Sequence, residues 1–341
     1  MSGLSGGLLA GPRGRRTVLE IVWALSTEHS HGPVWWPGAT ARATTEVLSR
    51  VPLSVPSEQV LVRAIAHAVD AARYWQEPDR TDLLAARPEV AAVLAPWAEL
   101  IEGADAPPWW SAPLDPDDQH EVRWVPHYGD GAAEGAITDA TSELERWRAA
   151  EAEDEARAAK ERPRNPAARW SGSWWSTPPL DLPTTTGRVP TDSETRTPAG
   201  LVWVEDSMGW TQAQTCRMRM PADARVLEVR PAGDWAALCA EWPLPVTASR
   251  RHDWYRATGE DHEWVIPDWA GVASRWDAIH LSTSAYLACA GVPIPTGDGR
   301  ASVIAGWAPH ETHWLVSLEP QGDTTQWVGS GEPGDPWAPV R

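Results

Sequence analysis

An apolar run, a capped turn and an amphipathic stripe follow one another across residues 264–282, and this succession limits what the chain can fold into. Residues 264–266 predict a strand, and Asp268 follows a proline in the position of a helix N-cap. Apolar side chains at three- and four-residue spacing over 269–276 predict a short helix, and 278–282 predict a second strand. Strand, helix and strand indicate an α/β layer, which commonly carries functional groups at its strand ends.

The periodicity of the whole chain predicts a helical first part and a mixed second part. Amphipathic stripes predict helices near 57–70 and 88–102, and the charge-rich segment 134–162 predicts an exposed connecting helix. Later, short apolar runs such as 201–205 and 225–229 predict strands. We therefore predict an α+β protein, with a disordered tail (1–15), a helical domain (16–126), a linker with the exposed helix (127–167), a mixed strand and helix domain (168–320) and a disordered tail (321–341).

Charge and hydropathy exclude several classes of partner. The 341 residues include 29 basic and 47 acidic side chains, for a net charge of -18, which disfavours nucleic acid and anionic membranes because both are bound through basic patches. No run approaches the ~18 apolar residues of a membrane-spanning helix. Three scattered cysteines, odd in number, predict a cytoplasmic protein with reduced thiols.

The chain has 24 tryptophans and no phenylalanine. One explanation is that a GC-rich coding bias replaces Phe by Trp in the core, where an indole packs well if its N–H finds an acceptor. The other is that the doublets 35–36, 109–110 and 174–175 form exposed stacking platforms for a sugar or a base. We favour packing, because aromatic side chains usually lie in cores.

Glu311 is the first candidate catalytic residue. It stands between His310 and His313 at the head of a predicted strand, where a carboxylate could stabilise a developing cation or take a proton. The alternative is a hairpin-edge acid that accepts hydrogen bonds from turn amides. The sequence HETH lacks the four-residue histidine spacing of a zinc protease helix, so no metal site is predicted.

Three further polar groups are candidates. Ser282-Thr283-Ser284 could offer hydroxyls to a phosphate or a carboxylate, with His280 at the same strand end, or Ser284 could simply cap the next helix. A further polar cluster in a predicted loop suits either a site or solvated surface, and it consists of Arg250, Arg251, His252, Asp253, Tyr255 and Arg256. Glu205-Asp206, after a predicted strand, reads as a carboxylate pair of a site or as a turn.

The order of Arg230, Ser282-Thr283-Ser284 and Glu311 resembles the Arg, Ser-Thr-Ser, Glu series of ADP-ribosyltransferase-type modules. The resemblance implies that NAD is a substrate, with no resident cofactor, and that the binding set is Arg230, Ser282, Thr283, Ser284 and His280. Arg230 would contact a phosphate, Ser282 would brace the site, and an indole would stack on nicotinamide. Glu311 would bond the ribose and stabilise the oxocarbenium ion as nicotinamide leaves.

One departure from that family's pattern bears on the acceptor. Pro309 stands where the family usually carries a second Glu or Gln, which disfavours transfer to a protein arginine. The sequence thus predicts an NAD glycohydrolase or an ADP-ribosyl transfer enzyme. The alternative is a non-catalytic, acidic protein of the interaction or immunity type, which the net charge and the many tryptophans would suit as interface anchors.

Overall fold

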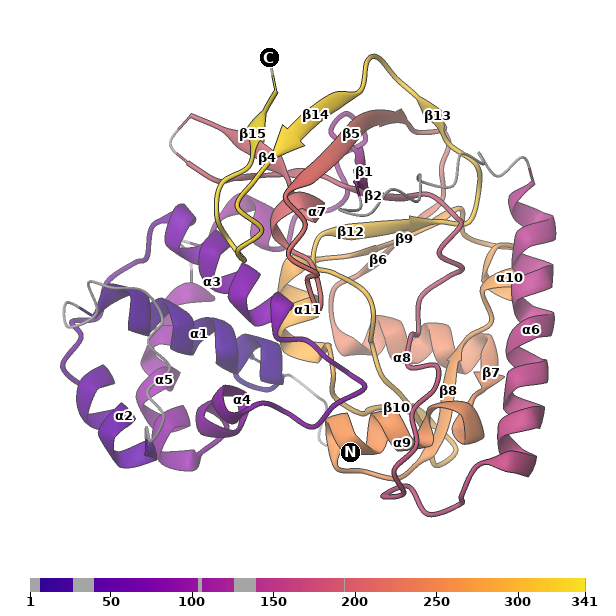
Figure 1. Cartoon of the computed structure of the whole chain (residues 1–341), viewed down its shortest axis with the longest axis horizontal. Coiled ribbons are helices and arrows are strands. Elements are labelled where there is room, and N and C mark those ends of the chain that lie inside the picture. The colour runs from indigo at the N-terminus through magenta and orange to yellow at the C-terminus, as the bar shows by residue number, and fades with distance from the viewer. Residues whose placement is uncertain (1–6, 27–39, 104–105, 126–138, 193, 341) are drawn as a thin grey trace.

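The computed structural model describes residues 7–26, 40–103, 106–125, 139–192 and 194–340 of the chain. Its N-terminal part is helical and the rest is rich in strands, which confirms the predicted α+β class. In Figure 1 the first five helices, in indigo and purple, lie beside the strand-rich part. Their bounds are α1 (Pro12–Leu25), α2 (Ala41–Leu48), α3 (Glu58–Asp70), α4 (Arg80–Ala85) and α5 (Pro88–Ile101).

Within the described residues, a nine-stranded mixed sheet organises the second part of the chain. The main path runs β15-β14-β5-β1-β2-β12-β9-β6, and β13 pairs with β5 outside it. β1 falls in the range predicted to be helical, yet it lies in the middle of this sheet. The bounds are β1 (His120–Trp124), β2 (Thr184–Thr186), β5 (Gln212–Arg219), β6 (Val226–Val229), β9 (Ala278–Leu281), β12 (Glu311–Trp314), β13 (Glu319–Pro320), β14 (Thr325–Val328) and β15 (Ala338–Pro339).

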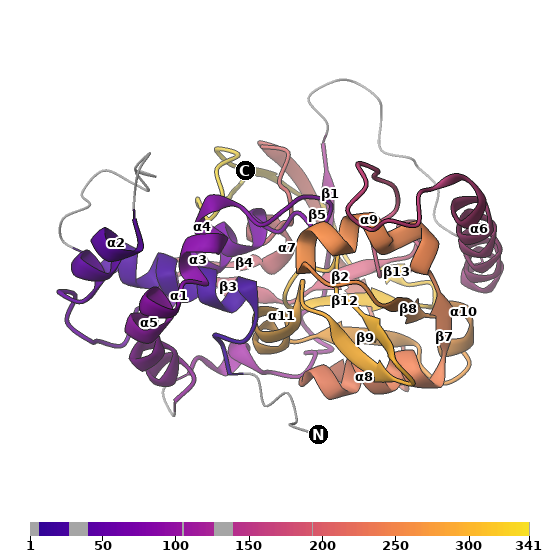
Figure 2. The same cartoon turned by 90° about the horizontal axis from the view of Figure 1, so that it is seen from below.

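Two smaller sheets and a second set of helices complete the described fold. The order β10-β11-β8-β7 forms one sheet and β3-β4 the other. Figure 2 shows α6 at one edge of the strand-rich part and α1 to α5 on the opposite side. The bounds are β3 (Arg188–Pro190), β4 (Arg196–Pro198), β7 (Pro243–Pro245), β8 (Glu263–Pro267), β10 (Ile294–Gly297), β11 (Arg300–Ser302), η1 (Pro108–Trp110), α6 (Ala140–Glu161), α7 (Ala199–Val202), α8 (Ala232–Glu241), α9 (Thr247–Thr258), α10 (Trp269–Val272) and α11 (Thr283–Cys289).

The predicted strand, helix and strand of 264–282 form as β8, α10 and β9. Asp268 caps α10, because its carboxylate accepts a 3.4 Å hydrogen bond from the Gly271 N–H. The helix ends at Val272, earlier than the apolar stripe indicated. The two strands lie in different sheets, since β8 pairs with β7 and β11 whereas β9 pairs with β6 and β12.

Helix α1 packs closely on α11 and so joins the helical and strand-rich parts through one continuous apolar core. Glycines make the approach possible. A Cβ on Gly11 would lie 2.5 Å from the Ala288 carbonyl oxygen, and one on Gly14 would lie 2.9 Å from the Leu287 carbonyl oxygen. Beside this contact the buried Arg13 guanidinium pairs with Asp82 and donates a hydrogen bond to the Ala68 carbonyl oxygen. Helix and sheet therefore share one core.

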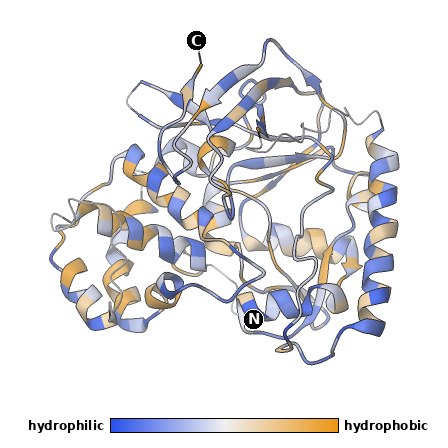
Figure 3. Cartoon of the chain, in the orientation of Figure 1, coloured by the Kyte–Doolittle hydropathy of each residue, from blue (hydrophilic) through white to orange (hydrophobic). Residues whose placement is uncertain are grey.

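The two charged segments of the sequence pack on each other. Figure 3 shows the hydrophilic character of α6, which was predicted as an exposed connecting helix. Glu155 on α6 accepts hydrogen bonds from the N–H groups of Ala248 and Ser249 at 2.7 and 2.8 Å, which satisfies the N-terminus of α9. Glu151 pairs with the buried Arg250 at 2.7 Å. The polar cluster at 250–256, predicted to lie in a loop, thus belongs to the helix α9, and its Arg250 serves packing.

Two further expectations differ from the structure. Residues 201–205 were predicted as a strand, but Leu201 belongs to α7, and Trp203 is buried with its indole N–H donating to the Val62 carbonyl oxygen at 3.1 Å. A short apolar run cannot distinguish strand from helix. The segment 321–341 was predicted to be disordered, but β14 pairs with β5 and the side chains of Trp327 and Trp337 are buried. These two indoles supply the apolar area that the tail's composition otherwise lacks.

Tryptophan packing is the main use of the indoles among the described residues. Seven of the largest fully buried side chains are tryptophans, namely Trp203, Trp235, Trp254, Trp264, Trp269, Trp307 and Trp314. The doublet at 109–110 is also buried, and the doublet at 35–36 lies outside the described residues. The third doublet, at 174–175, lines a cavity. In the described parts of the chain, no helix combines the length and the apolar character needed to cross a bilayer.

Candidate functional site

A cavity of about 250 Å³ opens on one face of the central sheet. Its floor is a row of residues paired across three strands, because His120 on β1 and Glu311 on β12 both lie opposite Thr186 on β2. Residues directly opposite each other in antiparallel strands share a face, so these side chains point the same way. The residues that line the cavity are His120, Val122, Trp124, Trp174, Trp175, Thr184, Thr186, Gly200, Trp203, Val204, Glu205, Gly306, Ala308 and Glu311.

The Glu311 carboxylate is held in place by its own strand and the turn before it. Its Oε2 accepts a 3.0 Å hydrogen bond from the Ala308 N–H and lies 3.1 Å from His313 Nε2. The His313 ring packs edge-on against Trp307 and its Nδ1 lies 3.3 Å from the Thr184 hydroxyl. The bond from the turn amide is the one expected of a hairpin-edge acid. The same geometry also fixes one oxygen of a side chain that lines the cavity.

Glu205 supplies a second carboxyl group to the cavity. Tyr286 on α11 donates a 2.8 Å hydrogen bond to its Oε1, and its Oε2 is shielded from solvent with no hydrogen-bond partner among the described residues. Burial raises the pKa of Glu205 to about 8, and the nearby Glu311 carboxylate acts in the same direction, against the hydrogen bond from Tyr286. The cavity therefore contains two carboxyl groups in different environments, and Glu205 is the one that favours its neutral form at pH 7.

Tryptophans form the walls. The Trp174 and Trp175 rings stack with centroids 4.8 Å apart, and Trp175 is 39% exposed. Their backbone is fixed from α9, because Trp254 Nε1 donates to the Trp174 carbonyl oxygen at 2.9 Å. Gly306 has a φ of 78°, and a Cβ there would lie 2.5 Å from the Trp175 ring. A glycine is thus required where the chain passes beneath this ring.

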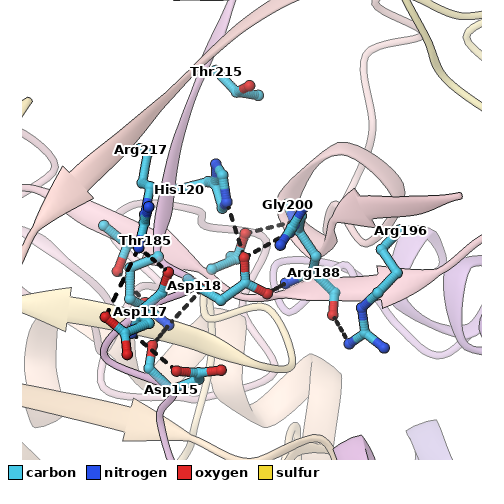
Figure 4. A network of polar contacts seen from close by, with 12 residues as sticks. Asp115, Asp117, Asp118, His120, Thr185, Arg188, Arg196, Gly200, Thr215 and Arg217 are labelled. Carbon is cyan, nitrogen blue, oxygen red and sulfur yellow. Dashed lines mark hydrogen bonds and ion pairs between the residues drawn. The ribbon is translucent and has the colours of Figure 1, made fainter. Parts of the chain in front are cut away.

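A polar network surrounds His120, which lines the cavity, and Figure 4 shows its contacts. His120 Nε2 lies 3.0 Å from Asp118 Oδ1, and the same oxygen accepts a 2.6 Å hydrogen bond from Arg188 Nε. Burial acts to raise the pKa of Asp118, but the bonds from His120 and Arg188 outweigh it and hold that pKa well below its usual range. Gly200 N–H donates to the Thr186 hydroxyl at 3.1 Å and brings α7 onto the floor.

The structure places the predicted site residues on neighbouring strands, but they do not share one cavity. Val229, Leu281 and Glu311 pair in register across β6, β9 and β12, so Arg230 and Ser282 each follow a residue of that row. Of these five residues, only Glu311 lines the cavity. Arg230 is exposed and its N–H bonds to Asp234.

The side chains of Ser282-Thr283-Ser284 mostly make contacts that stabilise the fold. Ser282, buried, caps α11 by accepting from the Ala285 N–H at 3.3 Å, which is the role that the sequence assigned to Ser284. Thr283 is buried as well, and its hydroxyl has no hydrogen-bond partner among the described residues. Ser284 instead shares a 2.8 Å hydrogen bond with Ser111.

His280 lies on the other face of the sheet from Glu311, since it pairs with Thr312. Its Nδ1 is 2.7 Å from Glu228 Oε2, and its ring packs against His310. Burial lowers the pKa of His310 to about 3, and the neighbouring His280 acts in the same direction. His280 and His310 are buried, and neither they nor Glu228 line the cavity.

Sequence reasoning noted Glu205 and the 174–175 doublet but did not unite them with Glu311. The sequence signal for the doublet was its place beside prolines in a segment without periodicity, which is typical of an exposed surface loop. Nothing in the sequence singled out His120 and Trp124, because β1 falls in the range assigned to the helical domain, 16–126. Only the strand pairing brings these groups together.

Among the described residues, no group of three His, Cys, Asp or Glu side chains is arranged to hold a metal ion. The three cysteines are free thiols, and burial raises the pKa of Cys239 to about 12. Comparison with known proteins gave no match to a family model, to a curated protein or to a solved structure.

Proposed function

We propose that this chain cleaves the glycosidic bond of a ribosyl substrate in the cavity, and that NAD is the first substrate to test. The observation that carries the proposal is the position of the Glu311 carboxylate, at the wall of a cavity lined by four tryptophans. The resemblance of the Arg230, Ser282 and Glu311 series to ADP-ribosyltransferase-type modules adds NAD as the substrate class.

The proposed role of Glu311 is electrostatic. When a ribosyl bond breaks, positive charge develops at C1′ and the ring oxygen, and a fixed carboxylate stabilises that charge. Glu311 is suited to the role because Ala308 and His313 orient one of its oxygens. A group held in place before the reaction spends no free energy on reorganisation during it.

The tryptophans are suited to hold a flat ring. The indole faces of Trp174 and Trp175 are partly accessible at the cavity, and aromatic faces stack on bases at about 1–3 kcal/mol per ring. Pockets for drug-sized ligands span roughly 300–1,000 Å³. The cavity of about 250 Å³ therefore suits one nucleoside-sized half of a dinucleotide, with the remainder outside.

We propose that Arg230 contacts that remainder. It follows Val229, which is two strands away from Glu311 in the paired row. Neighbouring strands lie about 4.8 Å apart, so the two backbones are roughly 10 Å apart across the sheet. An exposed guanidinium at that range could contact a pyrophosphate that leaves the cavity.

The test is consumption of NAD by the purified full chain, followed as release of nicotinamide. We expect Glu311→Ala to lose at least about 10²-fold in rate, the size typical of a lost charge-stabilising group. Glu319→Ala is the matched control, because Glu319 is an exposed glutamate on the edge strand β13. Equal release by the wild type and Glu311→Ala, or no release by either, would refute the proposal.

A further inference from the structure

We infer that His120 is the general base of this site, so that water is the acceptor of the ribosyl group and the chain is a hydrolase. The inference rests on the proposed cleavage at Glu311 and names the second substrate of that reaction. It is carried by geometry, because His120 and Glu311 line one cavity from the same face of the sheet.

The spacing of the lining residues along two strands shows that their side chains form the cavity floor. On β1 the lining residues are His120, Val122 and Trp124, and on β2 they are Thr184 and Thr186. Successive side chains of a strand point to opposite faces, so a spacing of two residues selects one face. The His120 side chain therefore lies on the cavity face, and 16% of its surface is exposed.

Asp118 decides which ring nitrogen of His120 can take a proton. Its Oδ1 lies 3.0 Å from His120 Nε2, and a carboxylate can only accept a hydrogen bond, so the ring proton belongs on Nε2. Nδ1 then carries the lone pair, and Figure 4 shows this second nitrogen directed away from Asp118. Nδ1 is thus the atom that can take a proton from water.

The charge of Asp118 supports the same role. Burial acts to raise the pKa of this carboxyl group, but the bonds from His120 and Arg188 hold that pKa well below its usual range, so the group is ionised. Arg188 Nε donates to the oxygen that faces His120, at 2.6 Å, and so fixes the position of the carboxylate. An ionised and fixed carboxylate orients the imidazole and stabilises the imidazolium that forms when Nδ1 takes a proton.

The separation of Glu311 and His120 leaves room for a sugar between them. Both lie directly opposite Thr186, and paired residues of antiparallel strands have Cα atoms about 4.5–5.5 Å apart, so the outer two are about 10 Å apart at the backbone. Inverting glycosidases separate their two carboxyl groups by about 6.5–9.5 Å, which leaves space for a water beside the sugar. Glu311 can therefore stabilise the ribosyl cation from one side while His120 activates a water on the other.

The size of the cavity favours water over a larger acceptor. The cavity measures about 250 Å³, and the nucleoside-sized half of a dinucleotide occupies most of it. A water molecule takes up about 30 Å³ in the liquid, which is less than any side chain of another protein that could accept the ribosyl group. The space left beside His120 therefore suits water.

The step balances in atoms and electrons. The bond from C1′ to the nicotinamide nitrogen breaks, and its electron pair leaves with nicotinamide, which becomes neutral. The water oxygen forms the new bond to C1′ and passes one proton to His120 Nδ1, which releases it to solvent. NAD and water thus give ADP-ribose, nicotinamide and one proton, with no oxidant or reductant.

The experiment follows nicotinamide release and the ribosyl product for the full chain and for His120→Gln, with and without sodium azide. Azide is an anionic nucleophile that has no proton to lose, so it attacks C1′ without a base. We expect hydrolysis by His120→Gln to fall about 10²-fold or more, the size typical of a lost acid–base group. Azide should then raise the rate of this variant at least tenfold, with ADP-ribosyl azide as the product, and should change the wild-type rate little.

Asp118→Asn is a second variant in case His120→Gln folds poorly. Its neutral amide no longer stabilises the imidazolium, so hydrolysis should fall at least tenfold, and azide should restore nicotinamide release. The matched control is Asp117→Asn, because Asp117 is the neighbouring carboxylate and its side chain is 94% exposed. This control should behave as the wild type with water and with azide.

The outcomes separate this inference from the proposed function. If the wild type releases nicotinamide and His120→Gln is equally fast, or is slow and not restored by azide, His120 is not the base and cleavage at Glu311 stands. For Asp118→Asn, an unchanged rate or a loss that azide does not restore counts against the inference in the same way. If the wild type releases no nicotinamide, both the inference and the proposed function fail.

Discussion

Glu205→Gln should change how the stability of the protein depends on pH. Glutamine has nearly the shape of a neutral carboxyl group and can accept the Tyr286 hydrogen bond, but it does not titrate. Glu205 has a pKa raised from 4.5 to about 8 by burial, so the folded state binds its proton more tightly than the unfolded state. The stability of the wild type relative to the variant is therefore greatest below pH 4.5 and is lost as pH rises to about 8.

The magnitude follows from the same pKa. A difference of about 3.5 between 4.5 and about 8 corresponds to about 5 kcal/mol, at about 1.36 kcal/mol for each unit of pKa. Unfolded Glu205 is already mostly ionised at pH 5, and water in the cavity screens part of the remainder, so we expect the variant to gain about 2–4 kcal/mol on the wild type between pH 5 and pH 9.

Urea unfolding, followed by tryptophan fluorescence at pH 5, 7 and 9, measures the free energy of unfolding of both proteins. Groups that titrate alike in the wild type and in Glu205→Gln cancel in the difference, so the pH dependence of that difference isolates Glu205. Glu319→Gln provides a control for loss of an exposed carboxylate. A difference between Glu205→Gln and wild type that stays constant within about 0.5 kcal/mol from pH 5 to pH 9 would refute the reasoning.

Three other substitutions test the packing and the buried ion pair on which the cavity's surroundings depend. Gly11→Ala should cost at least about 1–3 kcal/mol in urea unfolding, because its Cβ would meet the Ala288 carbonyl oxygen of α11 at 2.5 Å; unchanged stability would contradict the close approach of α1 to α11. Arg13→Met should cost about 3–5 kcal/mol by leaving the buried Asp82 with less charge compensation, and a loss under 1 kcal/mol in the same assay would argue against a buried pair. Gly306→Ala should displace the Trp175 ring and weaken NAD binding at least tenfold by fluorescence titration, whereas an unaltered affinity would place the ligand elsewhere.

The sequence predicted much of the fold because its strongest signals are local. The helices predicted near 57–70 and 88–102 form as α3 and α5. Ser57 caps α3 and Pro88 begins α5, and a cap and a first-turn proline act on backbone groups a few residues away. The strand predicted at 225–229 is also present, as β6, and its signal was likewise local, because it is a short apolar run. Errors arose where tertiary contacts decide. The polar segment 247–258 is helical because Glu155, far away in the sequence, satisfies its first N–H groups.

The candidate site was harder to predict, because its parts are distant in sequence. Glu311 was identified from its place at a strand head, and the structure does place it in a cavity. Its neighbour Glu205 was ambiguous, since the chemistry of that residue depends on burial beside Tyr286 and on no local pattern. Likewise His120 reaches the floor only through its pairing with Thr186. Long-range strand order, which single-sequence patterns do not encode, decides which side chains meet.

The most direct test of the central claim is a crystal structure of Glu311→Gln grown with saturating NAD. Glutamine keeps the shape of the side chain but removes the charge that stabilises the ribosyl cation, so the substrate should persist. The account predicts the nicotinamide ring against Trp174 and Trp175, with C1′ facing residue 311. NAD bound at another place, or a cavity left empty while NAD is saturating, would contradict it.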